Sequence, residues 1–355
     1  MASPKSQPFG EFDLINTYFL RNSSPNTASK QERAHVLLGI GDDCALLDSP
    51  PNDHILAVTS DMLVENRHFF SDTDPKLLGH KCLAVNLSDL AAMGAKPMAF
   101  TLSIALTQIN HAWLAAFSEG LHALSDRFNC PLIGGDTTSG PLTISITAIG
   151  HLPKNNALKR SNALAGDDIW LSGEVGDARC ILGIARGEWL PIPGSENFTH
   201  RMHAPEPRVD LGIALRGLAH VAIDISDGLL GDLQHILKAS HCNASIQIDQ
   251  VPVSTLLSNS SRELRRLCSL KGGDDYELCF TAPNANAPQI EAIGRALNLR
   301  LTKIGQITEA INKIESQSPS TPQFGRMRLI DQDGNSLDDK QTQIYLKSFD
   351  HFESS

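Results

Sequence analysis

The sequence predicts an α+β protein of two domains, and three observations lead to this prediction. The chain has 355 residues, which exceeds one ordinary core at roughly 100–200 residues per domain. Short apolar segments typical of strands alternate with longer segments typical of helices. A polar stretch at residues 153–156 separates two halves of this pattern. We therefore expect an N-terminal mixed α/β sheet domain over residues 1–153 and a C-terminal α/β domain over residues 154–355.

The N-terminal half begins this pattern with a strand. The expected strands are residues 54–59, 98–106 and 142–152, and the expected helices are residues 75–93 and 111–128. Asp74 is positioned to cap the first helix, and Gly94 is positioned to end it.

The C-terminal half repeats the alternation. Its expected strands are residues 168–171, 221–225, 244–248, 276–281 and 301–307. Its expected helices are residues 177–185, 209–218, 229–239, 262–270 and 287–297.

The composition excludes several classes of protein. A formal net charge of -10 argues against a nucleic-acid binder, which needs a basic face to meet the phosphate backbone. No apolar run approaches the roughly 20 residues of a membrane-spanning helix, and the N-terminus lacks the apolar segment of a secretory signal. The seven cysteines include no C-x-x-C pair, which indicates a reducing compartment and no zinc site. We expect a cytoplasmic protein that binds neither nucleic acid nor membranes.

A recurring unit gives the functional signal: an apolar strand that runs directly into a turn bearing aspartate. It occurs at residues 37–43, 57–61, 132–138 and 222–228. One such turn is weak evidence, because Asp and Gly are favoured in turns and at helix starts for backbone reasons. Four of them indicate a functional site, since strand ends are where rigid scaffolds present functional groups. Asp89 adds a carboxylate that shares one helix face with Asn86.

Electrostatics limits what such a site can be. Two carboxylates about 4 Å apart repel by roughly 4 kcal/mol at an effective dielectric constant of 20, so a converged set requires cations. Oxygen ligands without His or Cys suit Mg²⁺ or Ca²⁺, and Mg²⁺ that keeps water and phosphate ligands is typical of phosphoryl-transfer sites. The chain has no Walker-type or protein-kinase motif. Metal ions and a few basic groups would bind the phosphates. Arg160 is one candidate for such a basic group, although a solvated surface charge is an equally expected role for this residue.

Taken together, these motifs resemble those of the thiamine-monophosphate kinases, a family in the superfamily of aminoimidazole ribonucleotide synthetase and selenophosphate synthetase. The matching segments are GEFDLI at residues 10–15, GIGDDCA at 39–45, NLSDLAAMGA at 86–95 and GGDDYEL at 272–278. The resemblance covers nearly the whole chain. It implies an aminoimidazole ribonucleotide synthetase-like fold, a homodimer joined through the N-terminal domains, and active sites in clefts between the two domains.

The resemblance also implies an activity: Mg²⁺-dependent, in-line transfer of the ATP γ-phosphoryl group to thiamine monophosphate, with no covalent nucleophile on the protein. The residues implied to hold several Mg²⁺ ions are Asp43, Thr59, Ser60, Asp61, Asp89, Asp136, Asp224 and Asp227. Those implied to contact ATP are Gly135, Arg160 and Ser226, and those implied to face the thiamine substrate are His68, Asp274 and Phe349. Positioning and electrostatics would carry most of the catalysis.

Two alternatives stay open from the sequence. One is another ATP-dependent enzyme of the same superfamily that acts on a different acceptor. The other is a nucleotide- or metal-binding relative without turnover. Asp274 stands where the family usually has Glu, and Leu346 stands where it has Trp, so the sequence leaves this second alternative open.

Overall fold

The computed structural model describes residues 10–20, 35–41, 44–310 and 324–346. The chain divides into two compact units, residues 1–86 with 97–151 and residues 87–96 with 152–355. Helix α2 (Pro75–Ala92) gives its first part to one unit and its last part to the other. Within the described residues, no helix is both long and apolar enough to cross a membrane. Two of the predicted site residues, Asp43 and Phe349, lie outside the described residues.

The first unit is built on a four-stranded sheet with the strand order β3-β6-β4-β5. The strands are β3 (His54–Val64), β4 (Lys96–Leu106), β5 (Leu132–Ser139) and β6 (Thr143–Pro153). Strands β4 and β5 run parallel, with Ser103 opposite Asp136. Strand β6 alternates between buried and half-buried residues along its whole length, as expected for a sheet that is covered on one face. The short strands β1 (Val36–Leu38) and β2 (Leu46–Leu47) form a separate antiparallel pair.

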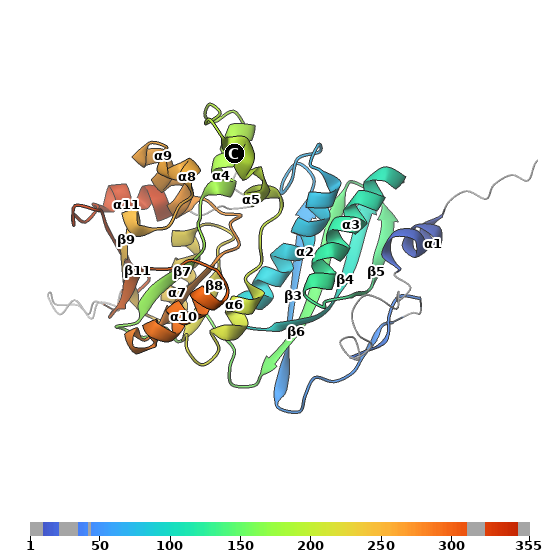
Figure 1. Cartoon of the computed structure of the whole chain (residues 1–355), viewed down its shortest axis with the longest axis horizontal. Coiled ribbons are helices and arrows are strands. Elements are labelled where there is room, and N and C mark those ends of the chain that lie inside the picture. The colour runs from blue at the N-terminus through green and yellow to red at the C-terminus, as the bar shows by residue number, and fades with distance from the viewer. Residues whose placement is uncertain (1–9, 21–34, 42–43, 311–323, 347–355) are drawn as a thin grey trace, which may run out of the picture. The chain divides into compact units, whose positions relative to one another are not determined.

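Helices α2 and α3 (His111–Arg127) cover one face of this sheet (Figure 1). Two glycines let the helices approach closely. A Cβ atom on Gly79 would lie 2.1 Å from the carbonyl oxygen of Phe117, and one on Gly120 would lie 1.8 Å from that of Lys76. Side chains at these two positions would therefore push the helices apart. Helix α1 (Glu11–Leu14) also belongs to this unit and continues into a π-helical turn at Ile15–Phe19.

Both ends of α2 have the capping residues that the sequence predicts. Oδ1 of Asp74 accepts hydrogen bonds from the backbone N–H groups of Lys76 at 2.8 Å and Leu77 at 3.0 Å, which are otherwise unsatisfied at a helix start. Gly94 has a φ of 67°, the left-handed conformation that commonly ends helices. Its N–H donates to the carbonyl of Ala91 at 2.9 Å.

The second unit is built on a six-stranded sheet with the order β12-β9-β11-β7-β10-β8. The strands are β7 (Asp168–Ser172), β8 (Val221–Asp224), β9 (Asn243–Gln247), β10 (Leu278–Ala282), β11 (Leu301–Thr308) and β12 (Met327–Ile330). All neighbours pair antiparallel except β12 and β9, which run parallel. The helices are α4 (Asp177–Ala185), α5 (Thr199–His203), α6 (Val209–Ala214), α7 (Leu229–Ala239), α8 (Thr255–Ser258), α9 (Arg262–Arg266), α10 (Ala287–Ala296) and α11 (Asp339–Leu346).

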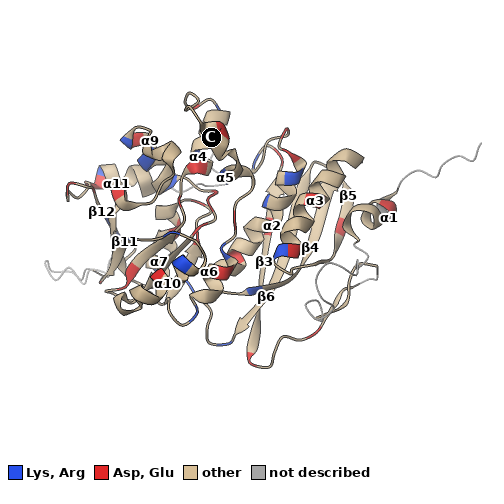
Figure 2. Ribbon diagram, viewed as in Figure 1, with Lys and Arg blue, Asp and Glu red and all other residues tan. Residues whose placement is uncertain are grey.

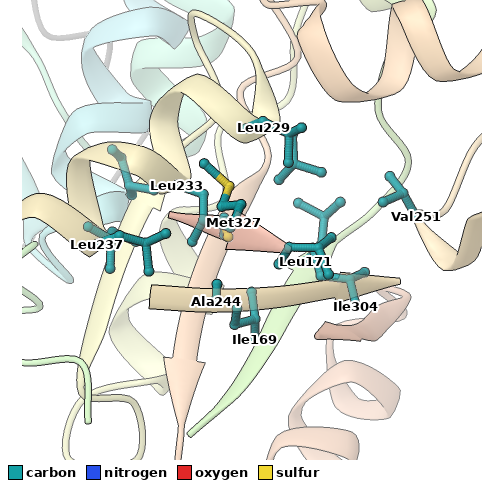
Figure 3. Close-up of a cluster of buried hydrophobic side chains, with 14 of the residues drawn as sticks. Ile169, Leu171, Leu229, Leu233, Leu237, Ala244, Val251, Ile304 and Met327 are labelled. Atoms are coloured by element: carbon teal, nitrogen blue, oxygen red, sulfur yellow. The ribbon is translucent and has the colours of Figure 1, made fainter. Parts of the chain in front are cut away.

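The core of the second unit lies between α7 and this sheet (Figure 3). Leu229, Leu233 and Leu237 repeat every four residues, so they share one face of α7. All three are fully buried, as are Ile169 and Leu171 on β7. Burying a side chain of this size contributes roughly 1.5–3 kcal/mol. The helix that follows Asp227 is thus fixed to the sheet along its whole length.

An ion pair stabilises the segment between Ile248 and Val251, two residues that belong to this core. The guanidinium group of Arg266 donates to both carboxylate oxygens of Asp249, at 2.9 and 2.5 Å. The two side chains are 13% and 8% exposed, respectively. The hydrogen bond from Arg266 is the main reason why the pKa of Asp249 is lowered, and the N–H of Gln332 adds a further donor at 2.9 Å. Asp249 therefore stays ionised in the folded protein.

The α+β class is confirmed, although several elements differ from their predicted bounds. Strand β3 continues to Val64, beyond the predicted end at residue 59. Strand β10 begins at Leu278, two residues later than predicted, because Asp274 and Tyr276 have left-handed backbones with φ of 68° and 53°. The predicted helix 209–218 ends at Ala214. The predicted helix 262–270 is α9 followed by a π-helical turn at Leu267–Lys271. Strand β12 and helix α11 are absent from the prediction, and β5, which was expected to run into a turn at Asp136, continues to Ser139.

Candidate active site

Thr59, Ser60 and Asp61 lie inside β3, and the prediction of a turn at these residues is wrong. The hydroxyl of Ser60 is 3.0 Å from that of Thr147 on β6, so pairing with β6 carries the strand past Thr59. The N–H of Asp61 donates to Oδ1 of Asn86 at 3.2 Å. Asn86 is fully buried on α2 and ties the backbone of Asp61 to the helix layer.

Gly135 and Asp136 lie inside β5, again not in a turn. Gly135 has a φ of 147°, and a Cβ atom there would lie 1.7 Å from the carbonyl oxygen of Leu102, so only glycine fits. Asp136 is exposed, and the N–H of Thr137 donates to its Oδ1 at 3.0 Å. Strands β3 and β5 are the outer strands of the sheet, about 14 Å apart along it at ~4.8 Å per strand step. The sheet thus does not place Asp61 beside Asp136.

His68 follows β3 in a turn that fixes the hydrogen-bonding state of its ring. The N–H of Val64 donates to Nδ1 of His68 at 2.9 Å, so Nδ1 acts as an acceptor. The proton of the neutral ring must then lie on Nε2. His68 can therefore offer an N–H donor at Nε2, the type of group that suits a phosphate or carbonyl oxygen.

In the second unit, Asp224 ends β8, and Ser226 and Asp227 form the turn before α7. The hydroxyl of Ser88 donates to Oδ2 of Asp224 at 2.8 Å, and both residues are buried. Ser88 directly precedes Asp89 on α2. This hydrogen bond therefore brings the helix that carries Asp89 next to the strand end that carries Asp224.

Asp232 fixes the turn that carries Asp227. Its Oδ2 accepts from the N–H groups of Asp227 and Gly228, both at 3.1 Å. Burial, and next the negative charges of Asp224 and Asp227, raise the pKa of Asp232 to about 8, and the two backbone donors oppose this rise. The carboxylates of Asp224 and Asp227 thus lie near enough to Asp232 to disfavour its ionisation.

Arg160 lies on a segment that is fixed to the end of α7. The hydroxyl of Ser240 donates to the carbonyl of Arg160 at 2.9 Å. The same Oγ atom accepts from the N–H groups of Asn162 and Ala163, both at 3.1 Å. Helix α7 therefore holds the turn of Asp227 at its start and the segment of Arg160 at its end.

The loop of Asp274 pairs directly with the loop of Ser226. The N–H of Asp274 donates to the carbonyl of Ser226 at 2.8 Å, and the N–H of Tyr276 donates to that of Ile225 at 2.9 Å. A Cβ atom on Gly273 would lie 2.1 Å from the carbonyl oxygen of Ser226, so the approach requires glycine. The loop of Ser226, predicted to bind the nucleotide, and the loop of Asp274, predicted to bind the substrate, are therefore held together by backbone hydrogen bonds.

The predicted metal ligands have the donor chemistry that suits Mg²⁺, because all of them are carboxylate or hydroxyl oxygens. The described ligands are divided between the units. The first unit holds Thr59, Ser60, Asp61 and Asp136, and the second holds Asp89, Asp224 and Asp227. Across the described part of the chain, no three His, Cys, Asp or Glu side chains form a group that could hold a metal ion. The donor types thus fit Mg²⁺, whereas neither unit groups three acidic ligands where the structure describes it.

Charged residues are interspersed along the described ribbon of both units (Figure 2). The whole chain has 40 acidic and 30 basic residues. Because a nucleoside triphosphate carries several negative charges, binding it near aspartates requires cations that offset the repulsion. Metal ions and a local arginine such as Arg160 would serve this purpose.

Sequence reasoning missed four residues that hold the predicted site in place: Ser88, Asp232, Ser240 and Tyr276. Two of them left a signal. Ser88 follows Leu87, and Asp232 stands between Gly231 and Leu233, in stretches rich in apolar residues, where a buried polar side chain needs a partner. Ser240 follows a predicted helix and Tyr276 begins a predicted strand, so no comparable signal marks either residue in the sequence.

Two family models match the chain and define its class. The N-terminal domain model of AIR synthase related proteins matches residues 41–152, and the C-terminal domain model matches residues 203–314. The chain thus has the two-domain architecture of AIR synthase related proteins.

Three relatives specify the family. A thiamine-monophosphate kinase of Haemophilus influenzae is 40% identical over 350 residues, which is 98% of this chain and 99% of the relative. The crystal structure of thiamine-monophosphate kinase from Stenotrophomonas maltophilia K279a is 42% identical with a TM-score of 0.76, covering 87% of this chain and 94% of that one. AaThiL complexed with AMPPCP and TMP is 25% identical with a TM-score of 0.68, covering 99% and 100%. The chain belongs to the thiamine-monophosphate kinase family.

Proposed function

We propose that the protein transfers the γ-phosphoryl group of ATP to thiamine monophosphate, giving thiamine diphosphate and ADP. The observation that carries the proposal is the 40% identity to a thiamine-monophosphate kinase across 99% of that relative. A solved relative of the same architecture is complexed with AMPPCP, an ATP analogue, and TMP. The direct pairing of the Ser226 and Asp274 loops supports a site in which nucleotide and acceptor are held by one structure.

The proposed metal is Mg²⁺. The residues that would hold it are Asp43, Thr59, Ser60, Asp61, Asp89, Asp136, Asp224 and Asp227. When bound, the metal neutralises charge on the phosphates of both substrates. Asp232 and Ser88 hold the turn of Asp227 and the carboxylate of Asp224, so these two ligands need little reordering to bind it.

The remaining site residues bind and orient the two substrates. Gly135, Arg160 and Ser226 would contact the phosphates of ATP. The absence of a side chain at Gly135 lets its backbone lie close to the carbonyl oxygen of Leu102. His68 would direct its Nε2–H toward the thiamine substrate, and Asp274 and Phe349 would complete that side. A strong general base is unnecessary, because a phosphomonoester with a second pKa near 6 is already largely ionised at neutral pH.

The proposed assembly is a homodimer formed through the N-terminal domain, residues 1–153. Its support is the apolar side of β3, where the side chains of Leu56, Val58 and Met62 are 52%, 64% and 58% exposed. These residues occupy alternate positions of an 11-residue strand at the edge of the sheet. An edge strand with exposed apolar side chains is normally covered by another part of the protein or by a partner. A second copy of the chain is the proposed cover. The mass in solution tests this, and Val58→Glu should yield a monomer.

We place the enzyme in the cytoplasm, where ATP is supplied. All seven cysteines are free, and six of them are buried. Free thiols are typical of reducing compartments.

A turnover assay tests the proposed function. The purified protein with ATP and Mg²⁺ should convert thiamine monophosphate to the diphosphate, leave free thiamine unchanged, and lose activity on chelation with EDTA. Turnover of another phosphate or carboxylate acceptor in place of thiamine monophosphate would favour a different enzyme of the superfamily. ATP binding without turnover of any acceptor would favour a non-catalytic relative. Either result would overturn the proposal.

A further inference from the structure

The segment before β10 has an unusual backbone. Asp274 and Tyr276 both have a left-handed φ, 68° and 53°, although neither is glycine. This conformation is uncommon for bulky residues and is energetically unfavourable, so it persists only where the surroundings enforce it. The surroundings here are Ser226 and Ile225, whose carbonyls accept from the N–H groups of Asp274 and Tyr276.

This backbone brings the two side chains together. The hydroxyl of Tyr276 donates to Oδ1 of Asp274 at 3.0 Å, and both residues are half-buried. A hydrogen bond to a charged group is stronger than one between neutral groups. The tyrosine ring has only two side-chain torsions, so it holds its partner at a small cost in entropy. The Asp274 carboxylate is thus oriented by a residue next but one along the chain.

The two residues that flank Tyr276 in the chain, Asp275 and Glu277, are both anchored by hydrogen bonds. The carboxylate of Glu277 is buried, accepts from the hydroxyl of Ser172 at 2.5 Å, and pairs with both nitrogens of the Arg208 fork. Directly before Tyr276 in the chain, both carboxylate oxygens of Asp275 accept from the N–H of Gly176 at 2.9 Å. Tyr276 is therefore held on both sides by residues whose own positions are fixed.

We propose that Tyr276 is a positioning residue, whose hydroxyl orients the Asp274 carboxylate toward the positively charged thiazolium part of thiamine monophosphate. The inference rests on the proposed function and extends it to a residue that does not itself contact the substrate. Because the same segment pairs with the Ser226 loop, the orientation of Asp274 is set relative to the nucleotide loop. The prediction is a selective effect on the acceptor substrate.

Three variants test the proposal by steady-state kinetics with both substrates varied. Tyr276→Phe should raise the KM for thiamine monophosphate about tenfold, equivalent to ~1.4 kcal/mol, with the KM for ATP and the melting temperature nearly unchanged. In an Asp274→Ala background, adding Tyr276→Phe should have no further effect, since the group that it orients is gone. Tyr345→Phe removes the same hydroxyl from α11 and is the matched control; it should leave both KM values unchanged.

The outcomes separate this inference from the proposed function. An active wild-type protein with an unchanged KM for thiamine monophosphate in Tyr276→Phe would overturn the positioning role alone. Equal rises in the KM values for both substrates would also overturn the positioning role. The same holds if Tyr276→Phe has the same effect with and without the Asp274 carboxylate, because a merely structural tyrosine would act in that way. A wild-type protein that does not turn over thiamine monophosphate would overturn both proposals.

Discussion

The ion pair of Arg208 and Glu277 fixes the start of β10, and Arg208→Leu tests how much it stabilises the protein. Nε of Arg208 donates to Oε2 of Glu277 at 2.7 Å, and a second guanidinium N–H donates to Oε1. The Arg208 side chain is 16% exposed and that of Glu277 is 3% exposed. Removing the arginine leaves a buried carboxylate whose remaining side-chain donor is the hydroxyl of Ser172. An unpaired buried charge is strongly unfavourable.

The expected loss is about 3–5 kcal/mol of unfolding free energy, a large share of the roughly 5–15 kcal/mol typical of folded proteins. Urea unfolding at pH 7, followed by tryptophan fluorescence, measures it, and Trp170 on β7 lies opposite Phe280 on β10. Glu277→Leu and the double variant complete the cycle.

The double variant decides whether the cost arises from the unpaired charge. With both charges replaced by leucine, neither partner is left buried and ionised, so the double variant should be more stable than Arg208→Leu alone. A loss below about 1 kcal/mol for Arg208→Leu, or single effects that simply add, would refute the reasoning.

Three further predictions follow from the structure. Asp61→Asn and Asp136→Asn should each lower kcat by about 10²–10³-fold, measured by product formation, while the melting temperature changes little because neither carboxylate is buried. Asp249→Asn should lower the unfolding free energy by about 3 kcal/mol at pH 7. Because the pKa of Asp249 is lowered in the folded state, its contribution is present above the unfolded value of about 3.9 and is lost as the pH falls through the folded value; urea unfolding at pH 7 and pH 3 measures the difference. Gly212→Ala places a Cβ atom 2.0 Å from the carbonyl oxygen of Ala91 and should cost about 1–3 kcal/mol by the same method.

Each of these predictions has a result that would contradict it. An active Asp61 or Asp136 variant would remove that residue from the metal ligands. An equal effect of Asp249→Asn at pH 7 and pH 3 would mean that its charge does not contribute. For the glycine, Gly140→Ala is the control, since its Cβ atom would make only an ordinary contact of 3.5 Å with Ala105; equal effects of the two alanines would refute the packing argument.

The sequence predicted elements best where a local signal marks their start. Helices α4 and α7 have their predicted bounds, Asp177–Ala185 and Leu229–Ala239, because glycines with positive φ at positions 176 and 228 precede them. Strand β12 was missed for the opposite reason. It is four residues long and pairs with β9, with Met327 opposite Ala244, so its stability comes from a partner more than 80 residues away.

The aspartates of the N-terminal unit illustrate the same limit. Their sequence pattern, an apolar run followed by Ser-Asp or Gly-Asp, is typical of a turn. Strand β3 nevertheless continues past Asp61 because β6 offers it partners over this length, including Thr147 for Ser60. Strand β5 likewise continues past Asp136, paired with β4 through Ser139. How far a strand continues depends on the partners that its neighbour offers, and the neighbour is not visible in the local sequence.

The aspartates of the C-terminal unit pose a different problem, because anchors and predicted ligands look alike in sequence. Asp232 accepts two backbone N–H groups with one oxygen, and Asp275 uses both oxygens on the N–H of Gly176. These bonds tie loops to the scaffold, so replacing either aspartate should chiefly affect stability. Asp227 and Asp274 instead enter these loops as the residues that are held, through their own N–H groups. The backbone N–H groups of Asp227 and Asp274 are thus fixed by their loops, whereas their roles at the metal and the substrate stay predictions.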